Sequence, residues 1–213
     1  MIESACHDNQ AKNYDKAVKT SIRCDQDYIR ENYFQLHDRV IELLNINSKD
    51  CILDIGIGTG LLEEKINNKC SLSGIDVSIK MLEKVKEKAL NVELKEGSFL
   101  SIPFKDRCFS KIITCFAFHH LSDEEKLIAL TEMERVLTDN GKIIIGDFMY
   151  ENNKKLKLLK EEFINNGRHD MIEEMQDENF TNIDWLLNLY ESNNYSIKYE
   201  QISTISWIVE IQK

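Results

Sequence analysis

Residues 51–60 of this 213-residue sequence, CILDIGIGTG, constrain its fold more than any other segment. A short apolar run that carries one acid leads into three glycines, Gly56, Gly58 and Gly60. Glycine adopts positive φ without a steric penalty and lets another molecule approach the backbone closely. The segment therefore predicts a buried strand followed by a tight turn beside a ligand.

The apolar pattern on either side of this turn alternates between strand-like and helical segments. Strand-like runs occupy residues 51–55, 70–76, 110–116 and 142–148, with one more beginning at residue 92. Helical spacing occupies residues 78–89 and 122–137. Strands that alternate with helices in this way predict right-handed crossovers and a mostly parallel, doubly wound α/β sheet.

Cap and turn signals bound these segments. Ser78 is expected to be the N-cap of the first of the two helices, and Ser122 with Glu125 forms a capping-box signature at the start of the second. The sequence DNG at residues 139–141 predicts a turn into the fifth strand. The alternating segments NYSIKYEQIS and TISWIVEIQK predict a closing hairpin, so the sheet is expected to end antiparallel.

Both ends of the chain lie outside the alternating series. The length suits one domain, which we place over residues 1–213. Helical patterns on the N-terminal side predict a cap over residues 1–48, and a second helical stretch, broken near Gly167, predicts a lid inserted at residues 151–180.

Charge and composition exclude several classes of function. The formal net charge is -10 and the pI is about 5.1, which disfavours nucleic acid and anionic lipid as partners. The sequence has no signal-peptide pattern and no apolar stretch of membrane-spanning length, so we expect a soluble, cytoplasmic protein. Its six cysteines include no C-x-x-C pair, which predicts reduced thiols and no zinc site.

The spacing of an acid after the glycine turn points to a nucleoside ligand. Asp76 ends the second strand 20 residues after Gly56, near the spacing at which a carboxylate reaches a ribose hydroxyl. The glycines read G-x-G-x-G and are followed by Leu61, which is one position away from the dinucleotide pattern, and no Walker-type motif is present. A nicotinamide-dependent reductase is therefore a disfavoured alternative.

The segments DIGIGTG and GIDVS resemble the class I S-adenosylmethionine-dependent methyltransferases. Four further segments, AKNYDKAV, EGSFLSIPF, TCFAFHHLSDEEK and the closing hairpin, are similar in that order to the small bacterial YrrT-like group of methyltransferases. The resemblance covers nearly the whole chain. It implies a Rossmann-like methyltransferase fold, with a seven-stranded sheet whose last strand is antiparallel, and S-adenosyl-L-methionine as cofactor.

The resemblance also implies a cofactor site. Residues 54–60, with Asp54 at their start, are expected to bind the methionine portion, and Asp76 is expected to bind the ribose hydroxyls. Val77 and Met81 are expected to flank the adenine, and Tyr14, in KNYDK, is expected to pack over the cofactor.

One position departs from the family pattern. The family usually places an acid two residues past the third strand, where it accepts from the adenine amino group, and this chain has Ser98 there. An uncharged hydroxyl contributes less than a carboxylate to such a hydrogen bond. Adenine binding is therefore expected to depend more on Phe99 and its apolar neighbours.

Methyl transfer from a sulfonium chiefly requires alignment of the acceptor and exclusion of water, and a base is needed only for a protonated acceptor. His119 and His120, which follow the fourth strand, are the candidates for this base, although helix capping or a place in the cavity wall would also explain them. Asp147 is a second candidate, with a structural role favoured. Adjacent side chains point in different directions, so the histidine pair is not expected to bind a metal.

Several observations favour a small-molecule acceptor. The DNA methyltransferases resemble one another in proline-containing motifs after the fourth strand, and the single proline here, Pro103, lies elsewhere. Phe163 and Met171 in the expected lid are candidate acceptor contacts. A protein that senses S-adenosylmethionine or S-adenosylhomocysteine without catalysis is the main alternative. The acceptor atom and the oligomeric state are left open.

Overall fold

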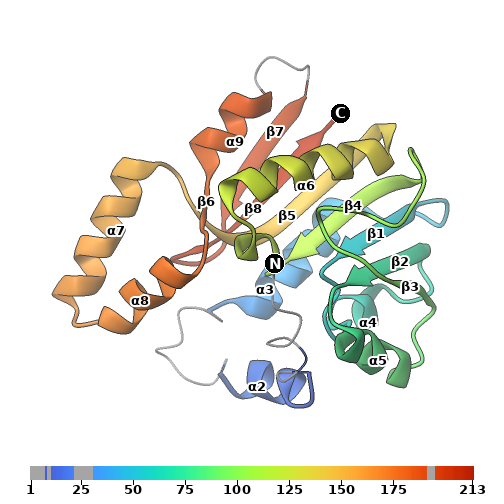
Figure 1. Cartoon of the computed structure of the whole chain (residues 1–213), viewed down its shortest axis with the longest axis horizontal. Coiled ribbons are helices and arrows are strands. Elements are labelled where there is room, and N and C mark those ends of the chain that lie inside the picture. The colour runs from blue at the N-terminus through green and yellow to red at the C-terminus, as the bar shows by residue number, and fades with distance from the viewer. Residues whose placement is uncertain (1–7, 9–10, 22–30, 191–194) are drawn as a thin grey trace.

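The fold is built around one mixed sheet. A computed structural model describes residue 8 and residues 11–21, 31–190 and 195–213. Within these residues, seven strands follow the order β3-β2-β1-β4-β5-β8-β7, and the short strand β6 pairs with β5 outside this order (Figure 1). The expected seven-stranded sheet of a doubly wound α/β protein is therefore confirmed.

The first five strands are parallel to one another. They are β1 (Cys51–Ile55), β2 (Ser71–Asp76), β3 (Val92–Glu96), β4 (Phe109–Cys115) and β5 (Leu137–Tyr150). From β1 the chain builds outward through β2 to β3, and it then returns to the other side of β1 as β4. The order of strands reverses between β1 and β4, which is where open α/β sheets bind ligands, at the carboxyl ends of the strands.

The closing hairpin supplies the antiparallel strands that the sequence predicts. They are β7 (Ser196–Gln201) and β8 (Ser206–Gln212), and β8 runs antiparallel to both β5 and β7. The two-residue strand β6 (Thr181–Asn182), which the sequence did not predict, pairs in parallel with the end of β5.

One predicted turn is wrong. Residues 139–141 belong to β5, which begins at Leu137 and not after the DNG sequence. The pairing register between β4 and β5 shifts between Phe109 and Lys111, so the extra residues form an irregularity inside the ladder and do not end it.

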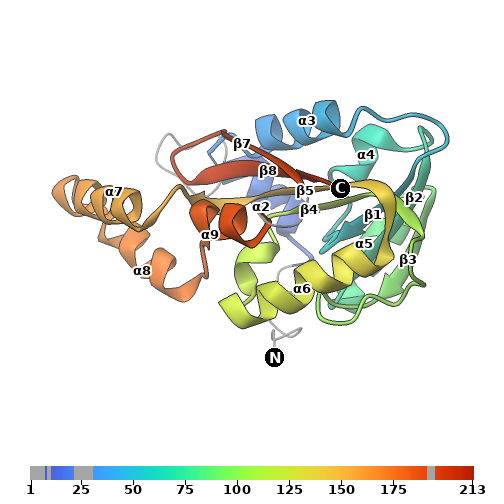
Figure 2. The same cartoon turned by 90° about the horizontal axis from the view of Figure 1, so that it is seen from above.

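Helices cover both faces of the sheet (Figure 2). They are α2 (Tyr14–Ser21), α3 (Tyr33–Leu44), α4 (Glu63–Ile66), α5 (Ile79–Glu87), the 3-10 turn η1 (Phe118–His120), α6 (Asp123–Val136), α7 (Asn153–Asn165), α8 (His169–Asp177) and α9 (Ile183–Tyr190). Helix α3 packs on one face through Leu36, Val40 and Leu44, which recur at four-residue intervals. Helices α6 and α9 pack on the other face and join its core.

The predicted helix caps are present. The Ser78 hydroxyl accepts a hydrogen bond from the backbone of Met81 at 3.2 Å. Ser122 and Glu125 form the reciprocal capping box at the start of α6. These two caps fix where the chain leaves the carboxyl ends of β2 and β4.

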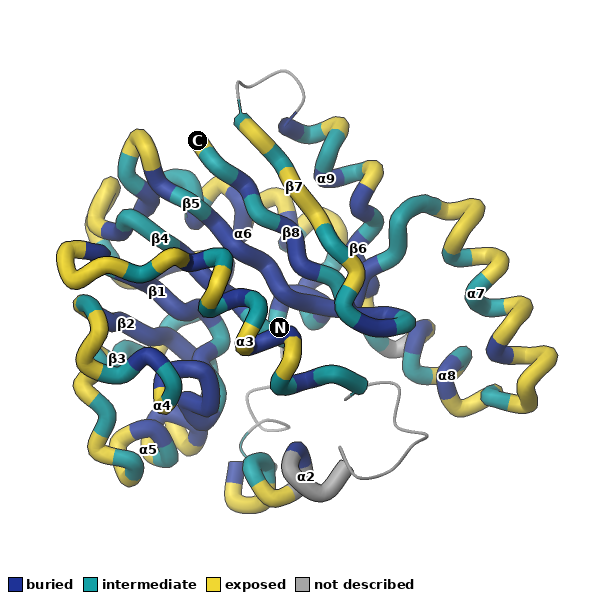
Figure 3. Tube along the Cα trace, turned by 180° about the vertical axis from the view of Figure 1, so that it is seen from behind, coloured by how far each residue is buried: buried dark blue, intermediate teal, exposed yellow. Residues whose placement is uncertain are grey.

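Helices α7 and α8 extend from one side of the sheet, and much of α7 is exposed, while the central strands are buried (Figure 3). The break between them falls at Gly167, as the sequence predicts, with a φ of +70°. At the other end of the chain, α2 and α3 lie within the expected cap, of which residues 1–7, 9–10 and 22–30 are outside the described part, together with Cys6 and Cys24. No described helix is long and apolar enough to cross a lipid bilayer.

Candidate active site

A cavity of about 490 Å³ opens at the carboxyl ends of the parallel strands. Its wall includes the glycine turn after β1, the end of β2 and the segment after β4. Residues of α2, α3 and α8 complete it. The cavity therefore lies where the reversal of strand order predicts a ligand site.

The glycine turn needs its glycines for two different reasons. Gly56, Gly58 and Gly60 have φ values of +76°, +55° and +78°. A Cβ atom on Gly56 would lie 2.6 Å from the Cβ of Ala117, whereas a Cβ on Gly58 would meet no atom within 4 Å. Gly56 is thus required by packing, and the open space beside Gly58 faces the cavity that it lines.

Gly60 does not line the cavity, in contrast to the expectation that the whole of residues 54–60 contacts the cofactor. A Cβ there would approach the side chains of Val85 and Leu90 to 3.3 Å. Its absence of a side chain therefore serves the packing of the turn against α5 and the residues after it.

Asp76 holds the turn in place. One of its carboxylate oxygens accepts a hydrogen bond from the Gly58 backbone at 2.9 Å, and the other accepts from the Ser78 backbone at 2.8 Å. The side chain is buried and lies at the cavity wall. A carboxylate at the cavity wall is an acceptor-only group of the kind that binds ligand hydroxyls.

Two more carboxyl groups lie buried beside the turn. Asp54 is 6% exposed and Glu63 is 1% exposed, and both line the cavity. Oδ1 of Asp54 and both carboxyl oxygens of Glu63 are buried without a hydrogen-bond donor among the described residues. Burial raises the pKa of both groups, and the neighbouring Glu63 raises that of Asp54 further. The pair is therefore a buried acidic site at the cavity wall, in which burial favours the protonated form.

Sequence reasoning missed Glu63. It lies in LLEEKI next to Glu64, and two successive acids in a short helix are usually solvated. Its neighbours Leu62 and Ile66 belong to the core that α3 forms with the sheet, so this segment lies in the interior.

The other expected cofactor residues surround the same space. Val77, Met81, Ser98, Phe99 and Tyr14 all line the cavity. Met81 and Phe99 are buried, and the hydroxyl of Ser98 accepts a hydrogen bond from the backbone of Leu100 at 3.3 Å.

The histidine pair lines another part of the cavity, after β4. His119 and His120 lie in η1, and their ring centroids are 4.1 Å apart. The premise that adjacent side chains point in different directions is therefore wrong here, because the 3-10 turn brings both rings to one side. Nδ1 of His119 lies 2.5 Å from Oδ1 of Asp147.

Asp147 is buried behind His119 and does not line the cavity. Oδ2 accepts hydrogen bonds from the backbone of Phe118 at 2.6 Å and of His119 at 3.1 Å, and Oδ1 accepts from Phe148 at 2.7 Å. Burial alone would lower the pKa of His119, but the Asp147 carboxylate outweighs it and raises that pKa. The same contact and the backbone donors outweigh burial at Asp147 and lower its pKa.

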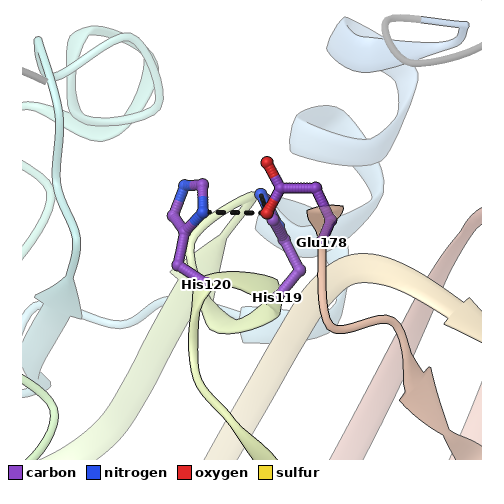
Figure 4. A group of neighbouring side chains, drawn as sticks. All are labelled: His119, His120 and Glu178. Atoms are coloured by element: carbon purple, nitrogen blue, oxygen red, sulfur yellow. Dashed lines mark hydrogen bonds and ion pairs between the residues drawn. The ribbon is translucent and has the colours of Figure 1, made fainter. Parts of the chain in front are cut away.

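A third side chain, Glu178, completes this part of the cavity. It follows α8, and its Oε2 lies 3.1 Å from Nδ1 of His120 and 3.8 Å from Nε2 of His119 (Figure 4). Burial alone would raise the pKa of Glu178, but the imidazoles of His120 and His119 outweigh burial and lower that pKa. The backbone of Asn179 donates to the carbonyl of His119 at 2.9 Å and fixes this loop against η1. Sequence reasoning missed Glu178 because it lies 58 residues from His120.

The expected acceptor contacts from the lid lie elsewhere. Phe163 and Met171 are buried with Phe148 and Phe180 in a core of their own. From α8 and the residues after it, the cavity receives Glu174, Glu178 and Asn179 instead.

Comparison with known proteins gives a consistent result. A family model described as a methyltransferase domain matches residues 52–141. An uncharacterized methyltransferase of Staphylococcus carnosus is 32% identical over 187 residues, which cover 86% of this chain and 89% of that protein. The uncharacterized methyltransferase YrrT of Halobacillus halophilus is 25% identical over 205 residues, 95% of this chain and 93% of that protein.

Solved structures share the fold. The structure described as a DhpI-SAM-HEP complex has a TM-score of 0.72 at 13% identity, and the match covers 100% of this chain and 98% of that one. At this identity the similarity shows the fold alone.

Proposed function

Because the chain belongs to the class I S-adenosylmethionine-dependent methyltransferases, we propose that it transfers the methyl group to a small-molecule acceptor by in-line displacement. The observation that carries the proposal is one cavity lined by two chemically different groups of residues. The glycine turn and Asp76 form the part that we name the cofactor end, and His119 and His120 form the part that we name the acceptor end.

The residues at the first end fit the cofactor. The open space beside Gly58 allows a ligand to approach the backbone, and the buried carboxyl groups of Asp54 and Glu63 offer acceptors for an ammonium group. We assign the methionine portion to Asp54, Gly56 and Gly58. Gly60 supports this turn from behind.

The remaining assignments follow the order of the cavity wall. Asp76 would accept from the ribose hydroxyls, while Val77, Met81, Ser98 and Phe99 would surround the adenine. Tyr14 would cover the site from α2. When bound, S-adenosyl-L-methionine supplies both the methyl group and the leaving group.

The histidine pair is positioned to activate the acceptor. When the ring of His119 is neutral and donates from Nδ1 to Asp147, its other ring nitrogen, Nε2, carries the lone pair. A lone pair in this position takes a proton from an acceptor hydroxyl or thiol, or binds a cation that acidifies it. We therefore assign catalytic roles to His119 and His120, and a positioning role to Asp147.

Two features support a small acceptor. The cavity of about 490 Å³ lies within the usual range for small-ligand sites, about 300–1,000 Å³. A net charge of -10 disfavours polyanionic acceptors such as nucleic acid. The helices α7 and α8 would act as a lid, since the loop after α8 brings Glu178 to the acceptor end.

The main alternative is a sensor that binds the cofactor or its product without turnover. It differs from the proposal in a measurable way, because a sensor releases no S-adenosylhomocysteine in the presence of any acceptor. A nicotinamide-dependent reductase is less favoured, since the glycine turn continues into Leu61.

The test is release of S-adenosylhomocysteine with panels of small thiols, phenols, alcohols, amines and carboxylic acids. We expect at least one small acceptor to accelerate release, and His119→Ala to reduce the acceleration by about 100-fold, within the range for loss of a general base. His169→Ala, which changes an exposed histidine of α8, is the matched control. The proposal would be contradicted if S-adenosylhomocysteine were released only with a protein or nucleic acid as the acceptor. It would also be contradicted if no acceptor accelerated the release.

A further inference from the structure

We propose that His119, His120 and Glu178 together bind a divalent transition-metal ion, for which zinc is the best match, at the acceptor end of the cavity. What the ion does there rests on the proposed function, but whether it binds does not. The proposal reverses the expectation from the sequence that the histidine pair holds no metal.

The ligand atoms are close to the spacing that a metal ion requires. One ligand atom from each of the three residues lies within 4.8 Å of the others. Tetrahedral zinc with bonds of about 2.0–2.1 Å places its ligand atoms about 3.3 Å apart. The distances from Oε2 of Glu178 are 3.1 Å to Nδ1 of His120 and 3.8 Å to Nε2 of His119, and rotation of the side chains would bring the three ligand atoms to the tetrahedral spacing (Figure 4).

The residue behind His119 is the kind of partner that metal-bound histidines have. A ligating imidazole usually donates its second ring nitrogen to a carboxylate, which fixes the ring and its tautomer. Nδ1 of His119 lies 2.5 Å from the fully buried Asp147, and three backbone N–H groups hold that carboxylate. Nε2 of His119 is thereby left to bind an ion.

The charge balance favours a cation. Asp147 and Glu178 contribute two carboxylates at or behind the site, and Glu174 also lines the cavity. The buried Lys126 opposes these carboxylates, but its Nζ donates to the carbonyl of Asn179 at 2.6 Å and lies 3.6 Å from Asp123. Among the three ligands themselves, only Glu178 carries a negative charge, so a bound dication would still attract an anionic acceptor.

The number of ligands indicates a catalytic and not a structural site. Three protein ligands leave at least one coordination position open, and the set of two histidines and one glutamate occurs in catalytic zinc sites. An acceptor hydroxyl or thiol in the open position would lose its proton to solvent, since a bound dication stabilises the anion. Its oxygen or sulfur would then form the bond to the methyl carbon while the carbon–sulfur bond of the cofactor breaks, giving S-adenosylhomocysteine.

The experiment measures metal binding directly. The full chain is stripped with a chelator and titrated with Zn²⁺ by calorimetry, and Co²⁺ is used as a spectroscopic probe of the ligand set. We expect one ion per chain, with affinity reduced at least about 100-fold in His119→Ala, His120→Ala and Glu178→Gln. Asp147→Asn should reduce it about 10- to 100-fold, as for other residues that orient a metal ligand.

Two variants serve as matched controls. His169→Ala and Glu173→Gln change exposed side chains of α8 and should leave the affinity unchanged. No binding by the wild type, or equal binding by all variants, would overturn the proposal and leave only the hydrogen bond between His120 and Glu178. If one of the three ligand variants fails to fold, the metal affinities of the other two still test the proposal.

Binding of S-adenosylhomocysteine is measured on the same samples. We expect it to persist in the metal-site variants, because the cofactor end has its own residues. Metal binding without any cofactor binding would contradict the proposed function and leave the metal site intact. Cofactor binding and turnover without metal binding would overturn the metal site and leave the proposed function intact.

Discussion

The two ends of the cavity are assembled in different ways. At the cofactor end, the glycine turn and Asp76 belong to the adjacent parallel strands β1 and β2, and 18 residues separate Gly58 from the carboxylate that binds it. At the acceptor end, three separate segments of the chain meet. Asp147 lies 28 positions from His119, and Glu178 lies 58 positions from His120. The first end is a local property of a strand–turn–helix unit, and the second exists only when the sheet and α8 are assembled.

The largest expected effect tests the packing of the cofactor end. Gly56→Ala should lower the free energy of unfolding by about 3 kcal/mol, because a Cβ 2.6 Å from Ala117 adds overpacking to the cost of positive φ. Gly167→Ala, with a similar φ of +70° and no atom within 4 Å, should cost about 1 kcal/mol. Urea denaturation measures the free energy of unfolding of both variants. An equal loss of stability in the two would show that the turn after β1 tolerates a side chain at residue 56.

A second change tests whether the acceptor end is separate. Asp147→Asn should reduce turnover by about 100-fold, because His119 loses the carboxylate that orients it. The dissociation constant of S-adenosylhomocysteine should change less than about threefold, since Asp147 does not line the cavity. The two constants are measured at a temperature where the variant is folded. An equal loss of cofactor binding would show that the two ends are one unit.

A comparison of two buried histidines sharpens the account of the acceptor end. His37 packs against the stacked rings of Tyr33 and Phe116. Burial, aided by Lys65, outweighs the opposing effect of Asp38 and lowers the pKa of His37 to about 3. The unfolded chain binds this proton near pH 6.5, so the stabilising contribution of neutral His37 is complete above pH 6.5 and decreases as the pH falls toward 3. His119, with its raised pKa, contributes in the opposite direction, below pH 6.5.

The measurement is urea denaturation between pH 7.5 and pH 5. At pH 5 the wild type should have lost about 2 kcal/mol relative to His37→Phe, which keeps an aromatic ring and cannot titrate. The difference between the two proteins isolates His37 from the other groups. Parallel curves for the two proteins would contradict the burial of a neutral His37.

The smallest expected effect concerns the open space of the cofactor end. Gly58→Ala should destabilise the fold only about as much as Gly167→Ala, since both have positive φ and neither meets an atom within 4 Å. It should nevertheless weaken binding of S-adenosylhomocysteine about tenfold, which is about 1.4 kcal/mol. Unchanged affinity would show that the space beside Gly58 is not occupied by the cofactor.

Sequence reasoning predicted the features that depend on neighbouring residues. The parallel strands, the antiparallel hairpin and the caps at Ser78 and Ser122 follow from periodicity and hydrogen-bonding rules within a few residues. The spacing of Asp76 after the glycine turn predicted a nucleoside ligand, and the resemblance to the methyltransferases supplied the other expected cofactor residues.

The features that it missed depend on the assembled fold. The burial of Glu63 depends on α3 and the sheet, and the contact between Glu178 and His120 depends on where α8 ends. Phe163 and Met171 looked like ligand contacts, but the helices α7 and α8 need them to form their own core against Phe148. A pattern of apolar residues cannot say which partner will cover it.

Thermal unfolding with added ligands is the first measurement to make, because it shows whether this protein binds S-adenosylmethionine. Each of S-adenosylmethionine, S-adenosylhomocysteine, NAD and NADP is added at about a hundredfold over its dissociation constant, which stabilises a binding protein by about 2.7 kcal/mol. For a chain of this length the midpoint should rise by roughly 5–10 °C. The account predicts this rise with the two S-adenosyl compounds alone, and no rise with either of them, or a rise with a nicotinamide, would contradict it.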